Sequence, residues 1–148
     1  MCEDKPFNLE SFLPYRLVQA GELVDQGLYR HYRSNYGMTR PEWQVLAHLG
    51  EYGKMSAGQI CKQSLIDKTK VSRAVFSREN RAWLVRTSDK DDRRTEWLAL
   101  TEAGHQVYQA LANAAIEYNQ RLCQELGDAA AAQLLALLRG LNINGNTP

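Results

Sequence analysis

The sequence has no apolar run long enough to cross a membrane. A transmembrane helix needs about 18 or more consecutive apolar residues, and no segment of the 148-residue chain approaches that length. The opening residues, Met-Cys-Glu-Asp-Lys, also lack the apolar core of a signal peptide. We therefore expect a cytoplasmic protein.

Residues that carry metal-binding or catalytic chemistry are few and scattered. The cysteines form no Cys-x-x-Cys pair and have no neighbouring histidine, which argues against structural zinc. No nucleophile stands beside a matching base, and there is no glycine-rich phosphate loop. The sequence therefore predicts a protein that is neither an enzyme nor dependent on a metal or cofactor. The three cysteines are Cys2, Cys61 and Cys123. Cys61 and Cys123 fall on helical faces typical of small buried hydrophobes, and redox sensing is the alternative.

The net charge of +1 conceals an uneven distribution along the chain. Residues 54–97 carry eleven Lys or Arg against six acids, whereas the rest carries seven bases and eleven acids. A basic middle between acidic ends is typical of a binding site for a polyanion such as nucleic acid. A solvated charged face is the alternative interpretation.

Apolar residues recur at intervals of three and four near both ends of the chain. This spacing predicts amphipathic helices over 10–36 and 101–141. Gly127 interrupts the second stretch, Asp128 is expected to cap its last helix, and residues 142–148 are expected to fray. Because the apolar stripes exceed what one small lobe needs, we expect these helices to form a two-fold dimer. A monomeric helical bundle is the alternative.

The middle segment, residues 38–100, contains three helix starts. Thr39 and Asp67 are good N-caps, and Ser56 with Gln59 has the pattern of a capping box. The last two helices are short and form a helix-turn-helix. Residues 83–87 and 94–100 are typical of strands around a polar loop over 88–93. The expected fold is mainly α with a small two- or three-stranded β wing, a winged helix-turn-helix lobe plus terminal dimerisation helices.

Three segments carry a recognisable pattern. They are Met38-Thr-Arg-Pro-Glu-Trp-Gln-Val-Leu-Ala-His-Leu, Asp67-Lys-Thr-Lys-Val-Ser-Arg-Ala-Val and Asp91-Asp-Arg-Arg-Thr-Glu-Trp-Leu-Ala-Leu-Thr-Glu-Ala-Gly. Together they resemble the MarR family of bacterial transcription regulators, in order and spacing, over roughly residues 10–140. The resemblance implies a single domain that forms a triangular homodimer, usually a repressor. Its DNA affinity would fall when a small molecule, often a phenolic or aromatic acid, binds below the DNA-binding lobe.

The chain departs from the family pattern at two positions. Arg78 stands where a core Leu is typical, and Ala82 stands where a Gly usually closes the second helix of the pair. A buried, unpaired Arg is costly, so Arg78 is expected to snorkel, to point at DNA or to pair with an acid such as Glu79 or Glu96. Ala in a left-handed conformation would add about 1 kcal/mol of strain.

The outer face of the helix after Asp67 holds the predicted DNA-reading residues, because an α-helix fits the major groove. Arg73 suits guanine, and hydroxyl groups suit bases or phosphates. For Thr69 and Ser72, helix capping or solvation is the alternative. Ser56, Gln59 and Lys62 on the preceding helix are expected to hold the DNA backbone. The predicted contacts from the second helix are Lys68, Thr69, Lys70, Ser72, Arg73 and Ser77.

The polar loop of the wing is expected to contact the minor groove. A long guanidinium at a hairpin tip suits the narrow, electronegative groove of A·T-rich DNA, and Arg93 and Arg94 are the candidates. By the resemblance, Arg94 inserts and Asp92 orients it through a charge-assisted hydrogen bond. Asp89 and Asp91 are expected to shape the turn. A surface cluster of ion pairs is the alternative.

The resemblance also places an effector cleft near the first two helices. Aromatic walls with one or two cations would suit an aromatic carboxylate, although aromatic residues at helical spacing are more often core residues. The candidates are Tyr15, Arg16, His31, Tyr36, Arg40 and Trp43.

These observations predict a sequence-specific regulator that binds double-stranded DNA at a palindromic operator. It is expected to act as a homodimer and as a ligand-responsive repressor. The helices over 10–36 and 101–141 would form the dimer, and residues 38–100 would bind DNA. The alternative is a winged-helix module that binds only proteins, and such a module would not need Lys70, Arg73, Arg93 and Arg94 together.

Overall fold

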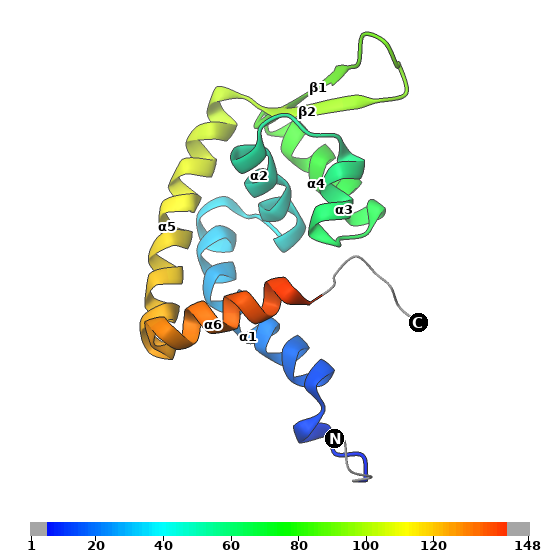
Figure 1. Cartoon of the computed structure of the whole chain (residues 1–148). Helices are drawn as coiled ribbons and strands as arrows, with labels where there is room; N and C mark the ends of the chain where they lie inside the picture. The colour runs from blue at the N-terminus through cyan, green and yellow to red at the C-terminus, as the bar shows by residue number, and fades with distance from the viewer. Residues whose placement is uncertain (1–5, 142–148) are drawn as a thin grey trace. The chain divides into compact units, whose positions relative to one another are not determined.

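A computed structural model describes residues 6–141, so Cys2 and the segment 142–148 lie outside the described residues. The described residues form two compact parts, one up to Ala112 and one from Asn113 on, and helix α5 contributes to both (Figure 1). No helix of the described range is long and apolar enough to span a membrane. The elements in chain order are the 3-10 turn η1 (Leu9–Ser11), α1 (Leu13–Tyr36), α2 (Arg40–Tyr52), α3 (Ala57–Ser64), α4 (Lys68–Asn80), β1 (Leu84–Ser88), β2 (Glu96–Leu100), α5 (Glu102–Leu126) and α6 (Asp128–Gly140).

The outer helices differ from the prediction at their starts. Helix α1 begins at Leu13 rather than at residue 10, because a separate turn precedes it and Pro14 occupies its first turn. It ends at Tyr36, followed by Gly37 in the left-handed conformation with φ 62°. The prediction that Asp128 caps the last helix is wrong. Asp128 is the first helical residue, and Gly127, with φ 88°, precedes it without a side-chain cap.

The predicted caps of the three middle helices are confirmed. The Thr39 hydroxyl accepts a hydrogen bond from the Glu42 amide at 3.4 Å, and the Asp67 carboxylate accepts one from the Lys70 amide at 2.9 Å. Ser56 and Gln59 form the reciprocal capping box. Each cap satisfies a backbone N–H that the helix itself leaves unpaired, which fixes where these helices begin.

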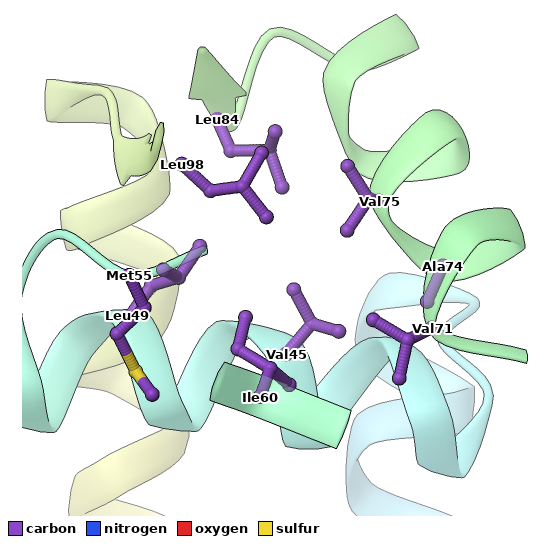
Figure 2. Close-up of a cluster of buried hydrophobic side chains, with 9 residues drawn as sticks. All are labelled: Val45, Leu49, Met55, Ile60, Val71, Ala74, Val75, Leu84 and Leu98. Atoms are coloured by element: carbon purple, nitrogen blue, oxygen red, sulfur yellow. The ribbon is translucent and has the colours of Figure 1, made fainter. Parts of the chain in front are cut away.

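The core of the first part lies where α2, α3 and α4 meet the two strands (Figure 2). Its side chains are at most 4% exposed. Fully burying one aliphatic side chain contributes about 1.5–3 kcal/mol relative to leaving it in water, so this cluster fixes α4 against α2. The cluster comprises Val45, Leu49, Met55, Ile60, Val71, Ala74, Val75, Leu84 and Leu98.

The two strands form an antiparallel hairpin whose register pairs Leu84 with Leu100 and Ser88 with Glu96. Both strands start later than predicted, at 84 and 96 instead of 83 and 94. Met55 adds a single bridge to Leu98, with both N–H···O hydrogen bonds formed. In the described chain the sheet therefore has two strands, and the third is reduced to one residue.

The turn between α4 and β1 is held by the start of α5. The Ala82 amide binds the Glu79 carbonyl, the Trp83 amide binds the Arg78 carbonyl, and Ala82 has φ 58°. These bonds define a Schellman motif, and the expected left-handed alanine is confirmed. The Thr101 hydroxyl donates to the Ala82 carbonyl at 2.6 Å and accepts from the Gly104 amide at 3.1 Å. A Cβ on Gly104 would collide with the Trp83 carbonyl, which explains why glycine follows Leu-Thr-x-x here.

Replacing Ala82 with glycine is expected to stabilise the protein by about 0.5–1 kcal/mol, because glycine adopts positive φ without the clash of a Cβ. Urea or thermal unfolding monitored by circular dichroism measures the change. Ala110→Gly is the matched control, since Ala110 is exposed within α5 and the same substitution in a helix interior costs about 1 kcal/mol. If Ala82→Gly lowers the stability of the protein, the positive φ of Ala82 is not a source of strain.

Candidate DNA interface

Helix α4 has a buried face and an open face. Val71, Ala74 and Val75 are at most 3% exposed and belong to the core. Because α4 is anchored through these side chains, the intervening positions point to solvent. Five predicted contact residues are exposed there, namely Lys68, Thr69, Lys70, Ser72 and Arg73.

Two predicted DNA-contact residues of α4 interact with neighbouring side chains. Ser77, four residues after Arg73 on α4, is half-buried, and its hydroxyl accepts a hydrogen bond from Arg78 at 2.9 Å. The Lys70 ammonium lies 3.7 Å from the Asp67 carboxylate, which also caps the helix. This exposed pair is weak and does not fix the lysine.

The predicted DNA contacts of helix α3 lie at its start and at one lysine in its last turn. Ser56 is half-buried and engaged with Gln59 in the capping box, so both side chains serve the helix start. Lys62 in the last turn is exposed. The polar groups of Ser56 and Gln59 are therefore already paired with each other's backbone amides.

The loop of the wing is organised by Asp92. Its carboxylate accepts hydrogen bonds from the Arg94 backbone amide at 3.0 Å and from the Thr95 hydroxyl at 3.3 Å. The prediction that Asp92 holds the Arg94 guanidinium is therefore corrected, because Asp92 holds the backbone instead. Arg93 and Arg94 are exposed, and their side chains form no ion pair within the described residues.

The acids beside the wing pair with Arg86 rather than with Arg78. The Arg86 guanidinium lies 2.9 Å from Glu79 and 3.2 Å from Glu96. These partly exposed pairs join α4, β1 and β2. They correct the expectation that Glu79 or Glu96 would neutralise Arg78.

Arg78 is 3% exposed and forms an ion pair with Glu42 of α2, with Nη2 and Oε2 2.7 Å apart. The two atoms are close, but their angle lies outside hydrogen-bond geometry, and Nε and Nη1 are buried without a hydrogen-bond partner. The guanidinium carbon lies 4.8 Å from the centre of the Trp83 ring. Burial lowers the pKa of Arg78, and Glu42 opposes that shift. The cation thus ties α4 to α2 and to the turn before β1.

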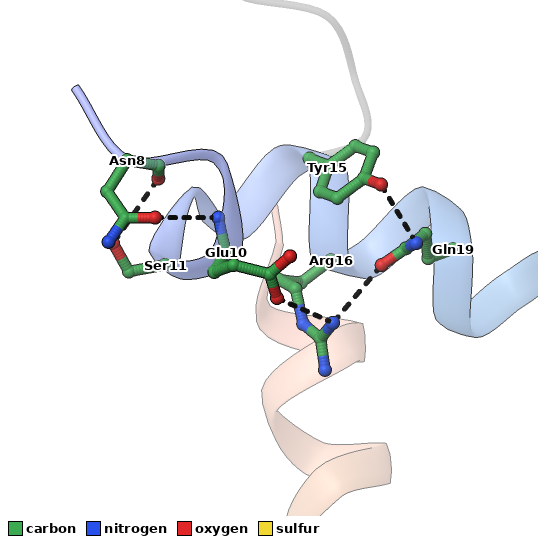
Figure 3. A network of polar contacts seen from close by, with 6 residues as sticks. All are labelled: Asn8, Glu10, Ser11, Tyr15, Arg16 and Gln19. Atoms are coloured by element: carbon green, nitrogen blue, oxygen red, sulfur yellow. Dashed lines mark hydrogen bonds and ion pairs between the residues drawn. The ribbon is translucent and has the colours of Figure 1, made fainter.

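The first two effector candidates lie near the start of α1. Tyr15 and Arg16 both bind the side-chain amide of Gln19, and Arg16 also lies 3.8 Å from Glu10 (Figure 3). Tyr36 stands at the other end of the same helix, about 30 Å away at 1.5 Å per residue. Tyr15 and Tyr36 of one chain therefore cannot line one small-molecule site.

The other candidates are also separated. His31 is exposed and contacts Asn35, whereas Trp43 is 8% exposed and stacks on the buried Tyr32 ring. Trp43 therefore packs in the interior of the described chain. Arg40 lies 3.2 Å from Glu22 and 3.4 Å from Asp25.

A shallow cavity of about 590 Å³ opens between the first turn of α2 and the turn that joins α3 to α4. It contains Arg40 but none of the other effector candidates. Its lining is Arg40, Pro41, Gln44, Ser64, Leu65, Ile66, Asp67 and Lys70.

The two described cysteines are free thiols. Cys61 is half-buried and packs against the core, and Cys123 is half-buried within α5. Over residues 6–141 no group of three metal-binding side chains comes together.

Sequence reasoning missed three residues. Phe76 and Asn80 are exposed on the open face of α4. Phe76 lies three residues after Arg73, and Asn80 lies four residues after Phe76. This helical spacing could have identified both residues from the sequence. Glu42, the partner of Arg78, lies 36 positions earlier in the sequence. Nothing local in the sequence indicates such a contact.

Two short helices packed on a common core, an exposed cationic face on the second helix, and a following hairpin with two exposed arginines are typical of a winged helix-turn-helix. The sequence model of the MarR family matches residues 36–95. Over these residues the chain is similar to the MarR family. No curated protein sequence matches it significantly.

Solved structures of regulators share the fold over nearly the whole chain. The MarR-family regulator SPO1453 from Silicibacter pomeroyi is 28% identical, with a TM-score of 0.80 over 92% of this chain and 96% of that one. A MarR/EmrR-family regulator from Acinetobacter is 25% identical, with a TM-score of 0.81 over 91% and 95%. BpsR from Bordetella bronchiseptica, whose DNA binding is regulated by 6-hydroxynicotinic acid, is 21% identical, with a TM-score of 0.80 over 91% and 96%.

The buried ion pair generates a stability prediction. Glu42→Gln is expected to destabilise the protein by about 3 kcal/mol, because it leaves the buried Arg78 cation without its counter-charge. Adding Arg78→Leu to that variant should recover most of the loss, since no buried charge then remains. Urea unfolding of the single and double variants measures both steps.

The matched control is the partly exposed pair Arg86 and Glu96. Glu96→Gln, alone or with Arg86→Leu, is expected to change stability by less than about 1 kcal/mol. If Glu42→Gln behaves like this control, or if the double variant is as unstable as Glu42→Gln, the ion pair does not hold α4 in place.

Proposed function

We propose that this transcription regulator binds double-stranded DNA sequence-specifically as a homodimer, with α4 in the major groove. The observation that carries the proposal is the open face of α4, which exposes hydroxyl and cationic side chains while its other face is locked into the core. A rigid helix about 10–12 Å wide fits the major groove of B-DNA.

The chemistry of α4 suits both reading and anchoring. Arg73 can donate two hydrogen bonds to guanine, and Thr69 and Ser72 can contact bases or phosphates. Lys68 and Lys70 are point charges suited to phosphates, as is Lys62 of α3. Because the pair between Lys70 and Asp67 is exposed, DNA phosphates can compete for the lysine.

The wing suits the neighbouring minor groove. We infer that Arg94 inserts there and that Arg93 contacts phosphate, since both side chains are exposed and form no ion pair with any residue of the range 6–141. Asp92 would act by fixing the backbone of the loop through the Arg94 amide and the Thr95 hydroxyl.

The dimer is proposed from apolar side chains at both ends of the described chain. Leu13, Val18 and Leu23 of α1 are 63–69% exposed. In α6, Leu134, Leu135, Leu137 and Leu138 are 38–66% exposed. Soluble proteins rarely leave such concentrations of large apolar side chains in water, so we assign the helices over 10–36 and 101–141 to the dimer and residues 38–100 to DNA. The operator would then be palindromic.

We further propose a ligand-responsive repressor whose effector is a hydroxylated aromatic acid. The support is the match to the MarR family model over residues 36–95 together with the regulation of BpsR DNA binding by 6-hydroxynicotinic acid. Adding 6-hydroxynicotinic acid and 4-hydroxybenzoate to a DNA-binding assay tests this response. An unchanged DNA affinity at millimolar concentrations of both compounds would argue against this effector class.

DNA binding is tested by fluorescence anisotropy with the duplex upstream of the protein's own gene, at two salt concentrations. We expect a sequence-preferring complex that weakens steeply with salt, because phosphate contacts release counterions. Arg94→Ala should weaken it by about tenfold or more, within the 1–3 kcal/mol typical of a specific contact. Sedimentation of the same preparation should give a two-chain particle.

Lys90→Ala is the matched control, because it removes one positive charge from the same loop. It should weaken binding less than Arg94→Ala and leave the preference for A·T-rich flanks unchanged. If the two variants weaken binding equally, Arg94 contributes only its positive charge and does not insert into the minor groove. Without sequence-preferring, salt-dependent binding at micromolar protein, the winged-helix lobe is a protein-interaction module instead.

A further inference from the structure

Phe76 is an apolar ring on the polar, cationic face of α4. Its side chain is 60% exposed. It lies three residues after Arg73 and four residues before Asn80. At these spacings all three side chains lie on the same face of the helix, and all three are exposed. Among the described residues no ring contact of Phe76 occurs.

The inner face of α4 does not need this ring. The core positions of the helix are already filled by Val71, Ala74 and Val75, and Arg78 occupies the next inward position. A single exposed apolar residue elsewhere on a surface calls for no explanation. Here, however, it stands one turn after Arg73 on the helix face that is proposed to enter DNA.

The major groove offers one apolar group, the C5-methyl of thymine, and Phe is among the side chains that contact it. Adenine, guanine and cytosine present only hydrogen-bonding edges there. A ring without donors or acceptors therefore favours a thymine over any polar edge, because it would leave the polar edge of another base without water or a partner.

We propose that Phe76 is a specificity-determining residue that selects thymine by contact with its C5-methyl group. This inference rests on the proposed DNA binding and adds to it the selection of one base, a thymine. Phe76 lies about 4.5 Å beyond Arg73 along the helix axis, at 1.5 Å per residue. Since base pairs are about 3.4 Å apart, the selected thymine lies within about two base pairs of the base that Arg73 contacts.

The test replaces single thymines with deoxyuridine, which lacks only the C5-methyl. The duplex is one that the wild-type protein prefers in selection from a randomised pool. Uracil at one thymine position should weaken wild-type binding by about fourfold, the value of one buried methyl group. Uracil at both symmetry-related positions should weaken it by about fifteenfold.

The protein variants distinguish a methyl contact from general weakening. Phe76→Ala should bind the thymine duplex about as weakly as the wild type binds the uracil duplex, and it should not respond to uracil. Phe76→Leu keeps an apolar contact and should retain part of the response. Arg73→Ala is the matched control, with lower affinity throughout but an undiminished response to uracil.

Two outcomes overturn the inference alone. One is wild-type binding that is sequence-preferring yet unaffected by uracil at every position. The other is an equal response to uracil in the wild type and in Phe76→Ala. If the wild type selects no sequence at all, the proposed function fails and this inference fails with it. Should Phe76→Ala not fold, the uracil series on the wild type and Phe76→Leu still decides.

Discussion

The burial of the inner face of α4 is the constraint on which the rest of the candidate interface depends. Val71, Ala74 and Val75 meet Val45 and Leu49 of α2 in the core. This packing fixes the rotation of α4 about its own axis, because turning the helix would expose the apolar stripe. The polar residues between the anchors consequently become an ordered surface rather than a flexible one.

The ends of α4 are held by different chemistry. At its start, the Asp67 carboxylate satisfies a backbone amide. At its end, Arg78 reaches Glu42 and the Trp83 ring, while the Thr101 hydroxyl holds the following turn. A buried cation and a left-handed alanine are both unfavourable locally, and they persist because the contacts around them fix the same geometry. The pose of α4 is thus coupled to the base of the wing.

Much of this architecture could be predicted from short-range patterns. The caps at Thr39, Ser56 and Asp67 and the inward positions of α4 follow from rules that act over three or four residues. Predictions failed where a partner lies far along the chain. Glu79 and Glu96 were plausible partners of Arg78, but in the structure both form ion pairs with Arg86. One failure is local: Asp92 accepts a hydrogen bond from the Arg94 backbone amide two residues away, a contact that depends on the conformation of the hairpin turn.

The sequence by itself determined where the three middle helices begin, which residues are apolar and where positive charge accumulates, because these depend on local chemistry and spacing. Only the tertiary structure decided which polar residues are already used. It buries Trp43, engages Ser77 with Arg78, pairs Glu42 with Arg78 and leaves Phe76 in solvent. Those outcomes depend on which surfaces meet when distant elements pack, and a helical period does not contain that information.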